Sequence, residues 1–325
     1  SRARLRSGRA RAVLINSGSA NACTGAAGLA AARETSSAVA DAWGIASAGV
    51  LVASTGVIGK PLPVKAIVAG VGQLHRAWRA GRDDPRQAAR AIMTTDTVPK
   101  IASATVRLHG GAARVWGMAK GSGMIAPNMA TMLACVLTDA AIPTGELRSA
   151  LRAVADRTFN CVTVDGDTST NDCLFLLASG RGGAARSAGE KARFRGGLED
   201  VCRELAHMIA RDGEGATKLV TVEVRGARTA SEARAAARTT RRSRPPRSTP
   251  PVSPMRSSDP PAPALSVQSS DSYRVPLVRR HRRLLQRLAR SHRCQHQHAN
   301  APRQHHQRLS HRSTAAPRFG GRSGA

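Results

Sequence analysis

The chain has 325 residues, with 50 Lys and Arg against 21 Asp and Glu, and its formal net charge is +29. This excess is typical of a nucleic-acid-binding protein, but residues 1–228 carry only +12 (30 basic, 18 acidic), whereas residues 229–325 carry +17 (20 and 3). No apolar run reaches the length of a membrane helix, no signal peptide is recognisable, and six scattered cysteines without a CxxC pair argue against a disulfide framework or a zinc ribbon. We therefore expect a cytoplasmic protein with no membrane partner.

The front part alternates apolar, β-branched runs with segments of helical spacing. Because strands and helices alternate, the predicted fold class is α/β. We expect strands at 11–16, 49–53, 113–118, 132–138, 173–178 and 218–224, and helices at 25–43, 62–80, 85–93, 144–158 and 198–211.

The last 97 residues differ in composition from the rest. They contain no Lys and no Ile, yet hold 11 of the 17 prolines and 7 of the 10 histidines. Such a segment buries too little apolar surface to offset the entropy of ordering the chain. It is predicted to be a disordered, basic tail.

Two Gly-containing loops follow strands and could carry chemistry. Ser54-Thr55-Gly56 ends a strand just before a helix, where free N–H groups point at an anion; a plain strand-to-helix turn that needs Gly is the alternative. The loop 119–133 contains Lys120 but lacks the order of a phosphate-binding loop. It also contains Ala130-Thr131, where a hydroxyl attack on the preceding carbonyl would free Thr131, whose amine is a built-in base. An Ala-Thr pair is also commonplace.

Two acidic loops are further candidates. Residues 164–172 hold Asp165, Asp167 and Asp172, but Thr170 and Leu176 stand where a calcium loop needs Gly and Glu. Short polar residues in such a loop also satisfy their own backbone. Glu214 lies between two glycines ahead of a strand, where its carboxylate could meet a ligand amine or simply be solvated.

Taken in order, six segments closely resemble the ornithine acetyltransferase (glutamate N-acetyltransferase) family of arginine biosynthesis, some of whose members are bifunctional. The resemblance covers most of Ser7 to about Arg238, and it implies the family's architecture, a layered, self-processing Thr-nucleophile acyltransferase fold. The segments are 16–25, 52–59, 93–100, 117–133, 163–172 and 212–218.

The resemblance implies a precursor that cleaves itself between Ala130 and Thr131. Residues 1–130 would form one chain and residues 131–238 a second, followed by the disordered tail at 239–325. Thr131 would take the acetyl group from N-acetylornithine and pass it to glutamate, with acetyl-CoA as a further donor in bifunctional members. Two copies of each cleaved chain would form a heterotetramer, and neither a metal nor a bound cofactor is implied.

The resemblance also assigns roles to individual residues. Thr55 and Gly56 match the oxyanion hole, which fits the large electrostatic contribution of such donors. The substrate-contacting positions match Thr94, Lys120, Thr131 and Glu214. Lys120 suits a substrate carboxylate, and Glu214 suits a substrate ammonium.

The sequence departs from the family at both ends. The family's opening stretch is absent before Ser1, and from Thr239 an Arg- and Pro-rich run replaces the family's last pocket residues. Such a change of composition is expected of an out-of-frame reading, so our hypothesis is a frameshifted gene and, with it, an inactive remnant of the enzyme. The rival function is nucleic-acid binding through the tail, which has only Tyr273 and Phe319 for base stacking; we expect no nucleic-acid partner.

Overall fold

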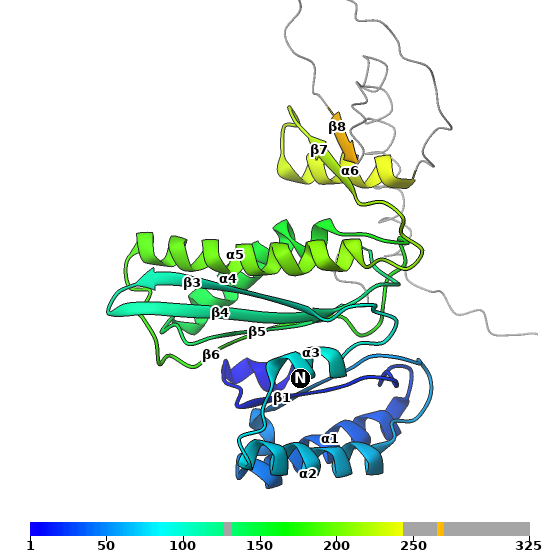
Figure 1. Cartoon of the computed structure of the whole chain (residues 1–325), viewed down its shortest axis with the longest axis vertical. Coiled ribbons are helices and arrows are strands. Elements are labelled where there is room, and N and C mark those ends of the chain that lie inside the picture. Colours follow the sequence, from blue (N-terminus) through cyan, green and yellow to red (C-terminus); the bar gives the residue numbers. More distant parts are fainter. Residues whose placement is uncertain (127–131, 243–264, 270–325) are drawn as a thin grey trace, which may run out of the picture. The chain divides into compact units, whose positions relative to one another are not determined.

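The computed structural model describes residues 1–126, 132–242 and 265–269. Its largest described sheet is mixed and has four strands (Figure 1). Its order is β3 (Lys100–Leu108), β4 (Gly111–Lys120), β5 (Leu133–Thr138) and β6 (Cys173–Ala178). The pairs β3/β4 and β4/β5 are antiparallel, and β5/β6 is parallel. Lys120, the last residue of β4, pairs with Leu133, the first of β5.

One face of this sheet is covered by α4 (Thr144–Arg157) and α5 (Ala188–Arg211). Leu174 and Leu176 point from β6 into this core, while the alternate residues of the same strand point to the other face. The wholly apolar sequence of β6 follows from burial on both sides. Gly197 lets α5 approach β3 closely, because a Cβ there would lie 2.4 Å from Val106 Cγ2.

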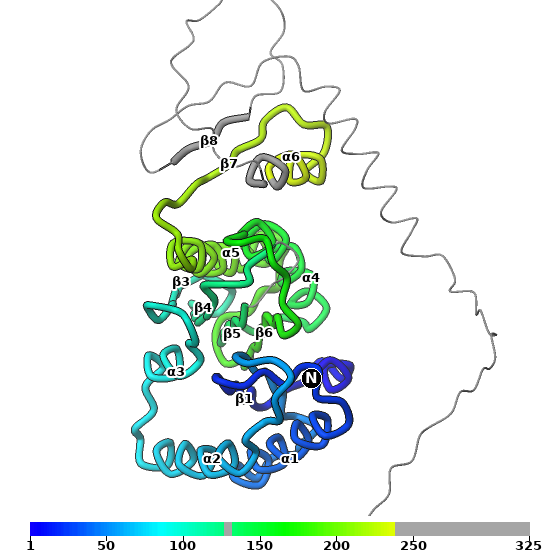
Figure 2. The backbone as a smooth tube through the Cα atoms, turned by 90° about the vertical axis from the view of Figure 1, so that its right-hand side faces the viewer, coloured from blue at the N-terminus to red at the C-terminus, as the bar shows by residue number. Residues whose placement is uncertain are grey.

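The other face packs on a two-stranded parallel sheet of β1 (Ala12–Asn16) and β2 (Val50–Ser54). Leu51 contributes to the core between the two sheets, and Val50 points the opposite way, toward α1 (Gly25–Trp43) and α2 (Val64–Arg79). The result is a layered order of helices, sheet, sheet and helices, which Figures 1 and 2 show from two sides. The predicted α/β class is confirmed at this level.

One capped end of α1 and one capped end of α3 (Pro85–Ala91) agree with the sequence. Helix α1 has the predicted bounds and ends at Gly44, which adopts a left-handed φ of 61°. The Asp84 side chain accepts the Arg86 N–H at 2.8 Å and caps α3. Short 3₁₀ turns lie at Arg4–Ser7, Ser47–Gly49 and Phe159–Cys161.

Three long stretches of regular structure were not predicted: the strand β3, the first ten residues of α5 and the helix Ala230–Arg242. Strand β3 was not predicted, because its small and polar residues hide the alternation, and its signal was the turn at Gly110 and Gly111, both of positive φ. Helix α5 begins at Ala188, ten residues before the predicted start at 198. Its start carries a reciprocal capping box between Ser187 and Glu190.

Ser1–Thr221 belongs to one compact unit and Val222–Arg242 to a second. The chain leaves the first along β7 (Val220–Val224), which pairs with β8 (Leu265–Ser269), and continues into α6 (Ala230–Arg242). The helix α6 and the strand β8 are therefore regular within the last 97 residues, which the composition predicted to be disordered. The other residues of 243–325 lie outside the described residues. No described helix is both long and apolar enough to cross a membrane.

Candidate active site around Lys120

Three of the predicted site residues meet at one ammonium group. Lys120 is only 2% exposed at the end of β4. Its Nζ donates to Thr94 Oγ1 at 2.6 Å and to Thr55 Oγ1 at 3.2 Å. Thr55 directly follows β2, and Thr94 lies between α3 and β3. Segments about 65 residues apart in sequence are thus joined by one buried cation.

The backbone around Thr55 decides which donors face a ligand. The Thr55 N–H donates to the Asn16 carbonyl at 3.0 Å, so it is already used, and the Thr55 hydroxyl is the group left beside Lys120. Gly56 has a φ of 125°, and a Cβ there would lie 2.3 Å from the carbonyl carbon of Gly18. Its N–H forms no hydrogen bond with another described residue. The predicted oxyanion hole would therefore use the hydroxyl of Thr55 and the N–H of Gly56.

Opposing effects set the charge of Lys120. Burial lowers the pKa of its ammonium, and the carboxylate of Asp96, whose Oδ2 lies 3.7 Å from Nζ, raises it. The positive charge of Lys100 lowers the pKa further, and the negative charge of Glu214 raises it. The net result is a lysine whose pKa lies below its ordinary value.

Glu214 reaches the same region from the end of α5. Its N–H donates to the Ser122 carbonyl at 2.7 Å, which ties it to the loop that follows Lys120. A Cβ on Gly123 would lie 2.6 Å from Glu214 Oε2, so the glycine makes room for this carboxylate. The carboxylate of Glu214 thus lies beside the loop at 121–126, called the Gly loop below, without contacting the ammonium of Lys120.

Ala130 and Thr131, the predicted cleavage site and nucleophile, lie outside the described residues. The adjoining residue is held firmly: Met132 is 3% exposed, and its N–H donates to Asp172 Oδ1 at 2.7 Å. The other oxygen of Asp172 is buried and has no hydrogen-bond partner among the described residues. Burial raises the pKa of Asp172 to about 7, against the Met132 N–H and the Lys120 charge. From the sequence, this aspartate was predicted only as a possible metal ligand.

The three carboxylates of the loop at 164–172 do not act together. Asp165 accepts the N–H groups of Met124 and Ile125, and also that of Asp167 at 3.0 Å. It therefore fastens the Gly loop after Lys120 and closes its own turn, as the backbone interpretation predicts. In the described part of the chain, no three His, Cys, Asp or Glu side chains are grouped to hold a metal ion.

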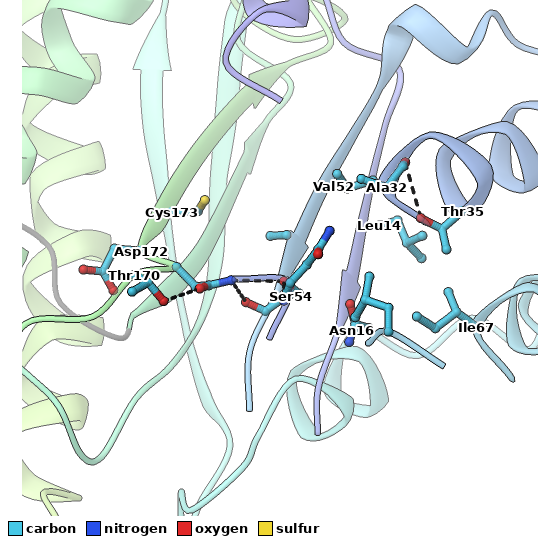
Figure 3. A pocket seen from close by; sticks show the side chains of 14 residues that line it. Leu14, Asn16, Ala32, Thr35, Val52, Ser54, Ile67, Thr170, Asp172 and Cys173 are labelled. Atoms are coloured by element: carbon cyan, nitrogen blue, oxygen red, sulfur yellow. Dashed lines mark hydrogen bonds between the residues drawn. The ribbon is translucent and has the colours of Figure 1, made fainter. Parts of the chain in front are cut away.

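A pocket of about 230 Å³ lies beside this region (Figure 3). Leu14 and Ile67 line it with apolar groups, and Asn16, Ser54 and Asp172 line it with polar ones. The Asn171 amide donates to the carbonyl and the hydroxyl of Ser54, both at 3.1 Å, and so links β2 to the start of β6. Because Ser54 precedes Thr55, and Asp172 holds Met132, the pocket shares both segments with the candidate active site.

Comparison of the sequence with known proteins identifies the family. The sequence model of the ArgJ family matches residues 1–247. The chain belongs to the ArgJ family. The arginine biosynthesis bifunctional protein ArgJ of Symbiobacterium thermophilum is 50% identical over 242 residues, which are 73% of this chain and 59% of that protein. That of Thermus thermophilus is 52% identical over 228 residues, 70% of this chain and 56% of that protein.

This chain therefore spans less than two thirds of the length of these ArgJ relatives. Among solved structures, the ornithine acetyltransferase of Mycobacterium tuberculosis, complexed with ornithine, is 41% identical. The match covers 39% of this chain and 67% of that chain, with a TM-score of 0.33.

Proposed function

We propose that this ArgJ chain is an acetyltransferase of arginine biosynthesis that moves the acetyl group of N-acetylornithine to glutamate through an acetyl-Thr131 intermediate. The observation that carries the proposal is the convergence of Thr55 and Thr94 on the buried ammonium of Lys120. Acetyl-CoA is proposed as a second acetyl donor. The cytoplasmic location and the assembly of two copies of each cleaved chain remain predictions.

The proposed activation step is self-cleavage. The Thr131 hydroxyl attacks the carbonyl of Ala130, the acyl group shifts from nitrogen to oxygen, and water hydrolyses the ester. The products are a carboxylate at Ala130 and a free amine at Thr131. That amine then takes the proton of its own hydroxyl and serves as the general base of the transfer reaction.

In the transfer, Thr131 Oγ attacks the amide carbonyl of N-acetylornithine. The developing negative charge falls to the Thr55 hydroxyl and the Gly56 N–H, and the nearby Lys120 cation stabilises it further. Ornithine leaves with the proton held by the Thr131 amine. The glutamate amine then attacks the acetyl ester and passes its proton to the Thr131 amine. That amine returns the proton to the departing Thr131 Oγ, which regenerates the nucleophile.

The charged groups suit amino-acid substrates. Lys120 is proposed to bind the substrate carboxylate. The hydroxyl of Thr94, which accepts a hydrogen bond from the Lys120 ammonium, is proposed to position both this ammonium and the substrate. Glu214, whose carboxylate lies against Gly123, is proposed to meet the substrate ammonium. Separate sites for the two charges orient the substrate.

The direct test is expression of the full chain. Denaturing gels and N-terminal sequencing are expected to give a second chain that begins at Thr131, and labelled acetyl is expected to pass from N-acetylornithine to glutamate. Thr131→Ala should leave a single chain without transfer, and Thr131→Ser, which keeps the hydroxyl, should retain part of both activities. A wild-type chain that stays whole and transfers no acetyl would reduce it to an inactive member of the family.

A further inference from the structure

A buried charge network that the family resemblance did not assign lies directly behind Lys120. Lys100 donates to Asp96 Oδ1 at 2.7 Å and to Asp212 Oδ2 at 2.5 Å. The side chains of Lys100 and Asp96 are 0% exposed, and that of Asp212 is 5% exposed. Charges so deep in a protein are retained only where they are paired and hydrogen-bonded.

The two buried lysines differ in how fully they are bonded. Lys100 has a third acceptor, the carbonyl of Val98 at 3.3 Å, so all three of its N–H groups are used. Lys120 donates only to the two threonine hydroxyls, and Asp96 Oδ2 stays beyond hydrogen-bonding distance at 3.7 Å. Asp96 therefore supplies Lys120 with a counter-charge but accepts no hydrogen bond from it. One N–H group of the Lys120 ammonium has no acceptor among the described residues.

The carboxylate of Asp96 is itself locked in place. Besides Lys100, it accepts the Gly121 N–H at 2.6 Å on Oδ1 and the Thr94 N–H at 3.2 Å on Oδ2. It thus fixes both Thr94, which holds the Lys120 ammonium, and the residue that follows Lys120. Burial acts to raise the pKa of Asp96, but the Lys100 ammonium and these N–H donors outweigh it and keep the pKa below its ordinary value.

Asp212 joins the network to the Glu214 loop. It accepts the backbone N–H of Thr97 at 3.0 Å and also the Thr97 hydroxyl, in addition to Lys100. Two residues on, the Glu214 N–H is bonded to Ser122. The hydroxyls of Ser122 and Thr95 are 2.7 Å apart and form a hydrogen bond. Hydrogen bonds therefore connect the loops at 94–97, 121–123 and 212–214.

We propose that Asp96, braced by Lys100 and Asp212, is a positioning residue that keeps Lys120 charged and directed toward an anionic substrate group. The role of Lys120 rests on the proposed function, whereas its charge state does not. The charged and titratable groups that act on Lys120 are Asp96, Lys100 and Glu214, and Asp172 is in turn sensitive to the charge of Lys120. Among them Asp96 is the largest influence that favours the charged form.

The test is an NMR titration of the full chain labelled with ¹³C-lysine. The six lysines give few signals, and the signal lost in Lys120→Arg identifies Lys120; the six are Lys60, Lys65, Lys100, Lys120, Lys191 and Lys218. In the wild type, Lys120 is expected to be charged at neutral pH, with a pKa below that of an exposed lysine. Asp96→Asn should lower that pKa by about one, a tenfold loss of proton affinity.

The matched control is Asp200→Asn, which removes a carboxylate of 70% exposed side chain from α5 and should leave the titration of Lys120 unchanged. Equal Lys120 titrations in Asp96→Asn and wild type would overturn the proposal. So would a wild-type Lys120 that is neutral at neutral pH, a result that stands even if Asp96→Asn fails to fold. Because NMR needs no turnover, an inactive chain sinks the proposed function and leaves this test intact.

Activity gives a second readout where transfer is measurable. Asp96→Asn is expected to raise KM for glutamate more than it lowers kcat, and to move the basic limb of kcat/KM to lower pH, because Lys120 loses its proton earlier. Asp96→Glu should restore part of the profile, since it keeps the charge. A uniform loss of kcat with an unchanged pH profile would indicate a merely structural role.

Discussion

The ion pairs around Lys100 and those along α5 use the same chemistry in opposite surroundings. Lys100 meets Asp96 and Asp212 with side chains that are at most 5% exposed. On α5, Arg203 is 49% exposed and contacts Glu199 and Asp200 across one helical turn. In water the attraction is screened and nearly offset by side-chain entropy, whereas a buried ion that loses its partner keeps its full desolvation cost. The contrast separates charges that hold loops together from charges that only cover a surface.

The largest effect is expected from Lys100→Met, which keeps the side-chain volume but leaves Asp96 and Asp212 without their shared cation. We expect a loss of about 3 kcal/mol in the free energy of unfolding, measured by urea denaturation. The control is Lys191→Met, at a pair with Glu146 whose two side chains are 35% and 44% exposed, with a loss below about 1 kcal/mol. Equal losses in the two variants would contradict the contrast.

A smaller, pH-dependent effect is expected at Asp172, which has one buried carboxylate oxygen without a hydrogen-bond partner among the described residues. Its pKa in the folded protein is about 7, above the ordinary 3.8. Below the ordinary value both the folded and unfolded states are protonated, and as the pH rises toward 7 only the unfolded state ionises, so stability falls. Allowing for solvent screening, the loss is about 1–2 kcal/mol.

Asp172→Asn should remove this dependence. Urea midpoints measured near the two ends of that pH range are expected to fall less in the variant than in the wild type. Parallel profiles for the two proteins would show that Asp172 ionises normally in the folded state.

The smallest effect is expected at Arg203 on α5. Arg203→Ala removes both of its ion pairs, yet the free energy of unfolding should change by no more than about 0.5 kcal/mol. The change should shrink further in added salt, because exposed pairs are screened. A loss above about 1 kcal/mol that persists in salt would place this pair with the buried ones.

Elements with a strong local signal could be predicted from the sequence, and others could not. Helix α1 combines uninterrupted helical spacing with a Gly stop, and its bounds are as predicted. Strand β3 alternates small and polar residues, and what makes it a strand is its pairing with β4 across the turn at Gly110 and Gly111, which no local pattern expresses. The first turns of α5 are similar, since Gly197 reads as a helix breaker until Val106 is seen packed against it.

The residue pattern alone made the loops of Thr55, Lys120 and Glu214 candidates, whereas the roles of these residues, and Thr94 altogether, came from the resemblance. The resemblance named Thr55, Thr94 and Lys120, which the fold brings together. It gave no role to Asp96, because an acid in a loop is usually solvated, and its burial depends on how three distant loops meet. The spacing of Asp96 and Lys100 was visible in the sequence, but outside a helix such spacing carries no expectation of contact.

The register of β4 and β5 has a consequence for the proposed cleavage. Lys120 pairs with Leu133, so the bond between Ala130 and Thr131 lies in the connection between two neighbouring strands of one sheet. A nick there would leave β3 and β4 on one polypeptide, and β5, β6 and α5 on the other, with a single core shared between them. The halves would remain associated as complementary fragments, and folding, once a unimolecular event, would become a bimolecular one whose midpoint depends on protein concentration.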